Sequence, residues 1–504
     1  MTRITLDNIV KSGVELACEF RSPNLDQEQT KGLRFIKENI ERGGLAVGIG
    51  PPGTGKTMVF SRAYAESFGE IDKDEVIVHI APTNRLVEET AVRTVALLTE
   101  QGFNEQDLKN SIRVYGSHFE PAPLTGDVKL VFSTGYQPGA LVKLSRLKRK
   151  VHIMVDEAST TAIHQAFISL SMALVNEIKK DNVEFIASLN VIGDPMQAIV
   201  ESYEPRWKYE HLIVYRITLS IIPEEERKTV LMDPPKIFSL AEKYADKSGI
   251  KYFFLNKTYR MPKPTEVLVS IPFYEQKLQA VKDCKQVLRD MLSDSSRTYS
   301  LISDSQCLRR YNDVKEAIDN ALDSQIPVVY IRDSGDAYST SRSYRGLDEY
   351  DELRSRLGGE IAAYLALRTV ARRIMMIAPY NEIIQQARWY VRSSFAKILE
   401  EERVKAIGFS TVHSVLGSEA DIIVAVLGKE YPGSKYETLY FQMPELINVQ
   451  LSRHSRLIVI IGNIEKLADN MSKKGKGYKH IGKLKMAVEN LKERDSIAMA
   501  EIKQ

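Results

Sequence analysis

A glycine-rich segment does most to limit what this chain can fold into. The segment Gly50-Pro51-Pro52-Gly53-Thr54-Gly55-Lys56-Thr57 matches the pattern GxxxxGK[ST] in full. The apolar run Leu45–Ile49 comes directly before it, and helical sequence follows. Glycines let backbone N–H groups turn inward around a phosphate, and the start of a helix adds partial positive charge. The segment therefore predicts a loop that binds a nucleoside triphosphate between a buried strand and a helix.

The side chains of this loop have expected roles. Lys56 should reach the β and γ phosphates, and the Thr57 hydroxyl should bind Mg²⁺. The backbone that should surround the phosphates belongs to Gly50, Pro52, Gly53, Thr54 and Gly55. ATP and Mg²⁺ are thus the expected ligands, although the loop alone does not say what the hydrolysis drives.

Two adjacent carboxylates follow a second apolar run. Val151–Val155 leads directly into Asp156 and Glu157, so both lie where the ligands of parallel α/β sheets bind, at the carboxyl end of a strand. Asp156 should hold Mg²⁺, mostly through water. Glu157 should orient and deprotonate the attacking water. A helix cap is the alternative for such a pair, but the position after a phosphate loop favours catalysis.

Three further side chains are candidates for the γ-phosphate. Gln197 follows the run that ends at Gly193 and could report hydrolysis. Phosphoryl transfer also needs positive charge, which an arginine often supplies. Arg260 lies near the expected end of the first domain, and Arg453 precedes a strand of the second. A surface ion pair is the alternative for each arginine.

The rest of the chain alternates short apolar runs with helical patterns, which is typical of parallel sheets covered by helices on both faces. The strands expected first are Leu45–Ile49, Val76–Ile80, Val128–Phe132, Ile153–Val155 and one within Val183–Ile192. The later ones are Val328–Ile331, Ile374–Ala378, Ile407–Phe409, Ile422–Leu427 and Leu457–Ile461. Helices are expected over Arg85–Leu98, Glu360–Val370 and Glu382–Tyr390. We expect an α/β protein.

A chain of 504 residues exceeds one ordinary core. We expect a first domain over residues 1–275 and a second over 276–504. Within them we expect a short N-terminal segment (1–23), insertions at 200–250 and 285–350, and a basic tail at 466–504. For the basic part of that tail, contact with phosphates and a solvated helix both stay open.

Composition indicates the cellular compartment more than it indicates the function. The net charge of +3 neither supports nor excludes a nucleic-acid partner. Three scattered cysteines (Cys18, Cys284 and Cys307) argue against a disulfide framework and a zinc site. A reducing interior follows, so we expect a cytoplasmic protein, with the nucleus left open. We expect no signal peptide and no membrane partner, because no apolar run reaches about 18 residues.

Several segments resemble the ordered motifs of the superfamily 1 helicases. They are Leu25–Gln29 (Q motif), Ala81–Asn84 (motif Ia), Thr258–Pro262 with Phe273–Leu278 (the "QYRMHP … FYEGxL" segment), Ser410–Asp421 (motif V) and Asn448–Arg453 (motif VI). The resemblance runs from about residue 24 to residue 463 and is to the Upf-like branch, superfamily 1B. Positive-strand RNA virus helicases share "SRH" and "TVH" sequences, so that sub-branch stays open, although Phe273-Tyr274-Glu275 favours the Upf-like one.

The resemblance implies a fold and several roles. It implies two RecA-like P-loop NTPase domains that close on one ATP. Gln29 would read adenine, Tyr259 would stack on it, and Glu419 would lie near the ribose or the phosphates. Arg260 and Arg453 would meet the γ-phosphate from opposite sides of the cleft. The groove for a nucleic-acid strand would be lined by Thr83, Asn84, Ser133, Thr134, Pro379, Tyr380, Thr411, His413 and Ser414. For each hydroxyl, a turn or helix cap is the alternative.

The implied function is that of a monomeric helicase or translocase. It would hydrolyse ATP to move along single-stranded or tailed DNA or RNA and to unwind duplexes, 5′ to 3′. One alternative is a strand-stimulated ATPase that remodels nucleoprotein complexes without separating strands. Another is a P-loop ATPase that acts on protein. Unwinding assays and stimulation by single strands separate the three.

Overall fold

The computed structural model describes most of the chain. The described residues are 3–19, 23–125, 127–135, 149–159, 186–197, 222–226, 236–292, 308–333, 349–395, 399, 401–415, 418–428, 443–471 and 479–502. The chain forms two compact units. The first consists of Met1–Pro195 with Ile199–Asn256, and the second of Met196–Ala198 with Lys257–Gln504.

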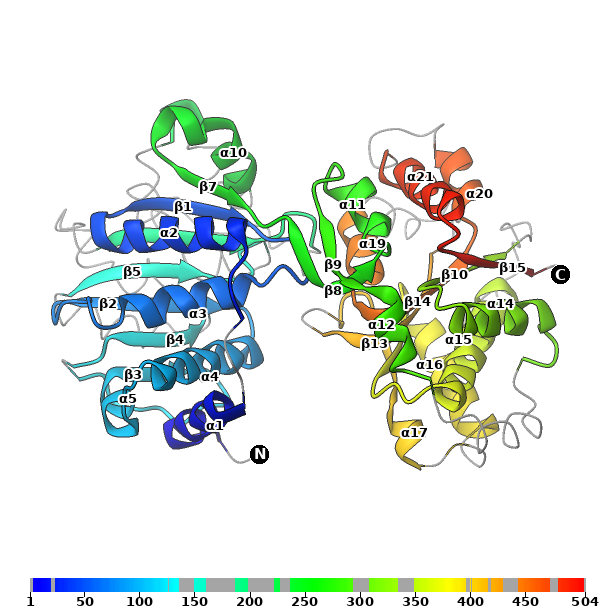
Figure 1. The fold of residues 1–504 in the computed structure, drawn as a ribbon, viewed down its shortest axis with the longest axis horizontal. Helices are drawn as coiled ribbons and strands as arrows, with labels where there is room; N and C mark the ends of the chain where they lie inside the picture. Colours follow the sequence, from blue (N-terminus) through cyan, green and yellow to red (C-terminus); the bar gives the residue numbers. More distant parts are fainter. Residues whose placement is uncertain are drawn as a thin grey trace. The chain divides into compact units, whose positions relative to one another are not determined.

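The first unit is built on a parallel sheet of seven strands in the order β3-β4-β2-β5-β6-β1-β7 (Figure 1). The strands are β1 (Gly44–Ile49), β2 (Glu75–Ala81), β3 (Ile112–Tyr115), β4 (Leu130–Thr134), β5 (Lys150–Val155), β6 (Ile186–Gly193) and β7 (Lys251–Phe254). β5, β6 and β1 are neighbours. Their carboxyl ends therefore bring the phosphate loop, Asp156 and Gly193 to one edge of the sheet.

Both faces of this sheet are buried. Along β2, Val76, Val78 and Ile80 belong to one apolar cluster, while Ile77 and Ala81 belong to the other. This alternation follows from the period of two in a strand. The helices are α1 (Leu6–Glu19), α2 (Gln27–Arg42), α3 (Lys56–Ser67), α4 (Asn84–Glu100), α5 (Glu105–Ser111) and α10 (Ile237–Ser248). The first four cover one face, and α10 packs with the cluster on the other (Figure 1).

The second unit has a parallel sheet of six strands in the order β12-β11-β13-β14-β10-β15. They are β10 (Val328–Asp333), β11 (Ile374–Ala378), β12 (Ile407–Thr411), β13 (Ala420–Val426), β14 (His454–Gly462) and β15 (Ala498–Ile502). A separate parallel pair joins β8 (Lys257–Lys263) to β9 (Gln279–Asp283).

The helices of the second unit complete its layers. They are α11 (Val267–Phe273), α12 (Cys284–Arg289), α14 (Asn312–Asp323), α15 (Glu349–Arg368), α16 (Asn381–Ser394), α17 (Glu401–Lys405), α19 (Pro444–Leu451), α20 (Ile464–Met471) and α21 (Lys479–Glu493). α14, α15 and α16 bury apolar side chains against one face of the sheet (Figure 1). Among the described segments, none is a helix with the length and apolarity needed to cross a bilayer.

The expected α/β architecture with two RecA-like, parallel-sheet units is confirmed, but three details differ. The units separate between Asn256 and Lys257, earlier than the expected boundary near residue 275. The reason is long-range pairing, because β8 joins β9 and α11 packs against α21. The expected basic tail is folded, since α21 buries Ile481 and Leu484, and β15 pairs with β10.

The third detail concerns the expected insertions. Residues 312–333, inside the expected insertion at 285–350, form α14 and β10, which pairs with β14 and β15 inside the sheet. They therefore belong to the sheet and its covering layer. In the expected insertion at 200–250, α10 packs on the first sheet. Residues 200–221, 293–307 and 334–348 lie outside the described residues.

Candidate active site and nucleic-acid interface

The phosphate loop joins β1 to α3 and is held in shape by its own polar groups. The Lys56 ammonium donates to the carbonyl of Gly50 (3.0 Å), and the Thr54 hydroxyl donates to the carbonyl of Pro51 (2.8 Å). Gly55 begins the helix with φ of 82°, a left-handed conformation that favours glycine. A β-carbon there would also lie 2.6 Å from the Gln29 amide nitrogen. The sequence thus dictates a tight turn directly before the helix.

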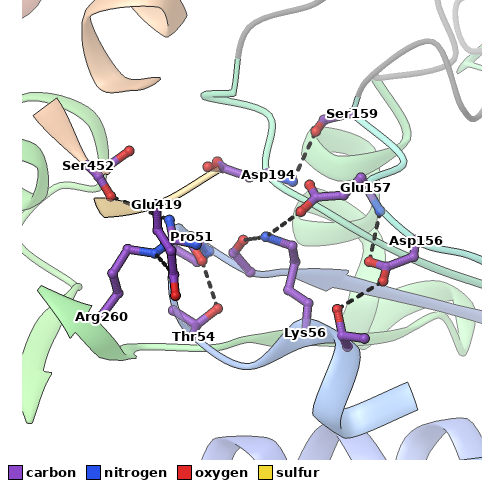
Figure 2. Close-up of polar contacts among 12 residues, drawn as sticks. Pro51, Thr54, Lys56, Asp156, Glu157, Ser159, Asp194, Arg260, Glu419 and Ser452 are labelled. Carbon is purple, nitrogen blue, oxygen red and sulfur yellow. Dashed lines mark hydrogen bonds and ion pairs between the residues drawn. The ribbon is translucent and has the colours of Figure 1, made fainter. Parts of the chain in front are cut away.

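The two carboxylates after β5 meet this loop. The Thr57 hydroxyl donates to Asp156 Oδ2 (3.2 Å), and Lys56 Nζ lies 3.2 Å from Glu157 Oε1 (Figure 2). Asp156 is fully buried, and burial together with the Glu157 charge raises the pKa of its carboxyl above the usual value. A half-buried hydroxyl beside a buried carboxylate provides oxygen ligands that suit Mg²⁺. The predicted metal ligands, Thr57 and Asp156, are therefore brought together.

Glu157 has an unusual backbone. Its φ of 48° lies in the left-handed region, which is uncommon for a residue with a side chain and costs free energy. The Glu157 N–H donates to Asp156 Oδ1 (2.8 Å). Such strain is concentrated at functional sites, where the surrounding structure compensates for it. This backbone directs the Glu157 carboxylate toward the Lys56 ammonium, the group that is expected to bind the phosphates.

Neighbouring strand ends are tied to this site by two hydrogen bonds from backbone N–H groups. The Gly50 N–H donates to the carbonyl of Gly193 (2.9 Å), and the Asp194 N–H donates to the Ser159 hydroxyl (3.1 Å). A β-carbon on Gly193 would lie 2.7 Å from the Ser159 nitrogen, so only glycine fits there. The sequence reasoning missed Ser159 and Gly193 as parts of the site. The Gly-Asp pair directly after an apolar run was the available signal.

Gln29 lies at the start of α2 and contacts the loop. Its amide nitrogen donates to the carbonyl of Thr54 (3.0 Å), and its amide oxygen accepts from the N–H of Asp26 (3.0 Å). Asp26 accepts in return from the Gln29 N–H (2.9 Å), which makes a capping box. Gln29 thus fixes the helix start against the phosphate loop, and its expected role toward adenine stays a prediction.

The two arginines both belong to the second unit. Arg260 lies on β8, where Nε pairs with Glu419 Oε2 (2.9 Å) and Nη1 approaches the carbonyl of Ser452 (3.4 Å) (Figure 2). Arg453 follows Ser452, directly precedes β14 and is 3% exposed. The expectation that Arg260 would come from the first domain and Arg453 from the second is therefore corrected. The pairing of β8 with β9 assigns both to one unit.

Three other predicted nucleotide contacts lie in the second unit. Glu419 is mostly exposed and contacts Arg260. Tyr259 is half-buried on β8. Gln197 is buried, and it follows Met196, whose carbonyl accepts from the Asn448 amide (2.7 Å). Their roles toward the nucleotide stay predictions.

The predicted strand-binding residues of the first unit line an open pocket of about 470 Å³. Thr83, Asn84 and Thr134 border it. Thr83 also caps α4, because its hydroxyl accepts from the Leu86 N–H (3.3 Å). Ser133 is different, since its side chain is fully buried and its hydroxyl donates to the carbonyl of Thr134 (3.0 Å). Alternation along β4 places only one of the two neighbours on this surface, so the assignment of Ser133 to the groove is corrected.

The same pocket contains residues that the sequence reasoning did not name. They are Pro82, Arg85, Glu88, Ser117 and His118. The Asn84 amide donates to the Ser117 hydroxyl (2.9 Å), which joins the start of α4 to the segment after β3. No motif marked Ser117 or His118, because they reach the pocket only through the neighbouring positions of β3 and β4.

In the second unit, the predicted groove residues lie at the ends of β11 and β12. Pro379 and Tyr380 lead from β11 into α16. The Thr411 and Ser414 hydroxyls hydrogen-bond each other (2.9 Å) and form a turn after β12. His413 is exposed in that turn. The turn provides these two hydroxyls with hydrogen-bond partners without a ligand. Their contact with a nucleic-acid strand therefore stays a prediction.

Known proteins match both units. Two family models, each described as an AAA domain, match residues 36–202 and 238–465. The mouse RNA helicase Mov10l1 is 24% identical over 280 residues, which are 53% of this chain and 22% of that protein. The chain thus spans about a fifth of the length of this curated relative.

Solved structures with a weaker likeness include helicases. Yeast Dbp5 bound to RNA and ADP BeF3 has 12% identity and a TM-score of 0.41, and the match covers 98% of this chain and 93% of Dbp5. The arterivirus nonstructural protein 10 helicase with DNA has 9% identity and a TM-score of 0.36, with coverage of 87% and 65%. These TM-scores are too low to support an argument, so the fold assignment depends on the strand order and the site.

The phosphate loop, the acidic strand end and the two parallel sheets define a P-loop protein with two RecA-like units. The two matching models describe the helicase domains of one family, and the sequence relative is a helicase of the same kind. The predicted resemblance to the superfamily 1 helicases, in the Upf-like branch, is therefore confirmed.

Proposed function

We propose that this chain hydrolyses ATP with Mg²⁺ and uses the cycle to move along a single strand of DNA or RNA and to separate duplexes, 5′ to 3′. One observation carries the ATPase part: Lys56 and Thr57 of the phosphate loop lie 3.2 Å from Glu157 and Asp156, respectively. Family membership supports the motor part. Direction and strand separation come from the resemblance alone.

The chemistry divides among the residues of this site. Lys56 binds the β and γ phosphates, and in doing so exchanges the Glu157 carboxylate for the ligand. Glu157, released from Lys56, takes a proton from the water that attacks the γ-phosphorus. The bond from that phosphorus to the β-γ bridging oxygen breaks, giving ADP and phosphate. Mg²⁺ held at Thr57 and Asp156 would neutralise charge on the phosphate oxygens.

By the resemblance, Arg260 and Arg453 supply further positive charge to the γ-phosphate. Their loss of this contact after hydrolysis would change the grip on the strand. The pocket bordered by Thr83, Asn84 and Thr134 supports the strand contact, because hydroxyl and amide groups bind phosphates without reading sequence.

The test measures ATPase rate with and without single-stranded DNA and RNA, followed by unwinding of 5′- and 3′-tailed duplexes. We expect stimulation by a strand and unwinding of the 5′-tailed duplex. Stimulation without unwinding would leave a translocase that remodels nucleoprotein complexes. A turnover rate that no strand changes would overturn the nucleic-acid motor, and unwinding of only the 3′-tailed duplex would overturn the polarity.

A further inference from the structure

A pocket of about 450 Å³ lies on the helical face of the second unit, and none of the residues assigned above lines it. It is formed by α15, α16 and the residue directly before α14, Tyr311. Its lining residues are Tyr311, Glu352, Leu353, Arg356, Gln386, Trp389 and Tyr390. Aromatic rings, a guanidinium and an amide together are the groups that bind nucleobases in single strands.

One wall of this aromatic pocket is held rigid by a buried carboxylate. Glu360 is 4% exposed, and its Oε1 accepts from the Tyr390 hydroxyl (2.7 Å) and from Arg356 Nε (3.1 Å). Its Oε2 accepts from the N–H of Leu308 (3.1 Å), which fixes the turn leading to Tyr311. The Arg356 guanidinium lies over the Tyr390 ring, 5.1 Å from its centre. Three separate segments are therefore fixed around the pocket.

Two other lining residues carry groups with unused binding capacity. Trp389 is 63% exposed, an unusual state for the largest side chain, whose burial would be favourable. Gln386 Oε1 is shielded from solvent and accepts no hydrogen bond from any residue in the described part of the chain. An aromatic face and a shielded amide side by side suit a flat, polar-edged ring.

The surroundings of the pocket are basic. Arg392 is exposed on α16, three positions after Trp389, and Arg309 and Arg310 are exposed directly before Tyr311. Glu352 is an acidic group of the lining. Exposed arginines next to the lining residues complement the phosphates of a nucleic-acid strand, whereas a peptide ligand would not require them. Charge thus favours nucleic acid as the occupant.

We propose that this aromatic pocket is a second binding site for single-stranded nucleic acid, in which a base stacks on Trp389 and the Gln386 amide contacts its edge. Arg310 and Arg392 contact the neighbouring phosphates. Trp389 follows Tyr380, a predicted groove residue, by nine positions on α16, about 13 Å along the helix axis. One strand can therefore reach both. This inference deepens the proposed function by giving the motor a holding contact outside its groove.

The experiment uses the full chain without ATP, so that binding is separated from turnover. Affinity for fluorescein-labelled (dT)20 and (rU)20 is measured for the wild type, Trp389→Ala, Trp389→Phe and Met486→Ala. Met486 is a matched control, because it is also an exposed apolar side chain of the second unit (56%). We expect Trp389→Ala to bind about tenfold more weakly, since one stacked base contributes about that factor. Trp389→Phe should recover most of the loss, and Met486→Ala should bind normally.

A second measurement identifies the contact directly. Strands carrying 5-iodouridine are irradiated with the protein, and the adducts are mapped by mass spectrometry. We expect adducts on Trp389, Tyr311 or Tyr390. Affinity of Trp389→Ala within twofold of the wild type, with no adduct in the pocket, would overturn the second site and leave the pocket to a peptide. A wild type that binds neither strand would overturn the proposed function as well.

Discussion

The phosphate loop of the first unit and the Arg260 region of the second unit each hold a cation against a carboxylate, at very different depths. The side chains of Lys56 and Glu157 are 9% and 16% exposed, whereas those of Arg260 and Glu419 are 16% and 60% exposed. A buried pair is costly to break by removing one partner, while an exposed pair contributes little. The first site is thus preformed, and the second can exchange its partner at small cost.

This difference suggests that Lys56 and Arg260 have different roles in the reaction. Lys56 is held beside the loop by Gly50 and by Glu157, and bound phosphates would take the place of the Glu157 carboxylate as its anionic partner. Arg260 is held by a carboxylate that is open to water, and a phosphate can replace that carboxylate easily. We therefore expect changes at the loop to abolish the reaction and changes at Glu419 to adjust it. The predictions below test this contrast, starting with the largest expected effect.

Lys56→Ala should lose ATPase activity by on the order of 10³ or more, because it removes the main charge on the β and γ phosphates. It should also weaken nucleotide binding. Turnover and binding of a fluorescent ATP analogue measure the two effects. Lys11→Ala is the control, since Lys11 lies exposed on α1 (76%). Normal turnover by Lys56→Ala would contradict the assigned site.

Arg453→Ala should lower the turnover rate by roughly 10³ if Arg453 neutralises the γ-phosphate in the transition state. Binding of ATP should change little, because Arg453 belongs to the second unit and the phosphate loop to the first. Rapid-quench measurement of a single turnover separates the rate of hydrolysis from the binding of ATP. Arg456→Ala is a nearby control that removes an ion pair with Asp421 (3.2 Å). Equal losses in the two variants would point to destabilised folding instead.

Glu157→Gln should bind ATP while turnover falls by roughly 10²-fold or more, because the amide cannot take the proton from water. The substitution also removes the ion pair with Lys56, so affinity for ATP should not fall. Isothermal titration gives the affinity and a phosphate-release assay gives the rate. Wild-type turnover would refute the role of Glu157 in activating water.

Each unit also buries a neutral histidine, and this leads to a prediction for stability. Burial lowers the pKa of His79 to about 3 and that of His454 to about 3. Unfolded histidine binds a proton near pH 6.5, so the unfolded state holds more protons between that value and pH 3. Stability is therefore complete above about pH 6.5 and falls with pH below it, by about 2 kcal/mol per histidine at pH 5.

Urea unfolding at pH 7 and pH 5 measures this loss. His454 lies 2.6 Å from the Thr265 hydroxyl, so His454→Gln keeps a polar group there but removes the titrating one. The loss between pH 7 and pH 5 should then be smaller by about 2 kcal/mol. The same loss in wild type and variant would show that His454 does not contribute.

What the sequence could predict depended on how local the determinants are. Strand, loop and helix are contiguous around Lys56, so spacing alone placed the phosphate loop and the Asp156–Glu157 pair at strand ends. The unit boundary depended on the pairing of β8 with β9 and the packing of α11 on α21, which lies more than 200 residues further along the chain. No local pattern carries that information, and the grouping of Trp389 with Tyr311 and Arg356 is equally non-local.

Glu419→Gln should change the kinetics least of these variants, and the direction of the change in KM for ATP distinguishes two roles of Glu419. If Glu419 only neutralises Arg260 before ATP binds, its removal frees the arginine, and KM for ATP should fall by up to about fivefold with kcat unchanged. If Glu419 instead contacts the ribose, as the resemblance implies, KM should rise. Glu275→Gln is a matched control, because Glu275 is also exposed and paired with a cation, Lys277 (3.2 Å).

The salt dependence of KM provides a second test, since an exposed ion pair weakens as ionic strength rises. The KM difference between Glu419→Gln and wild type should therefore shrink at high salt, and a difference that salt does not change would contradict a screened, exchangeable partner for Arg260.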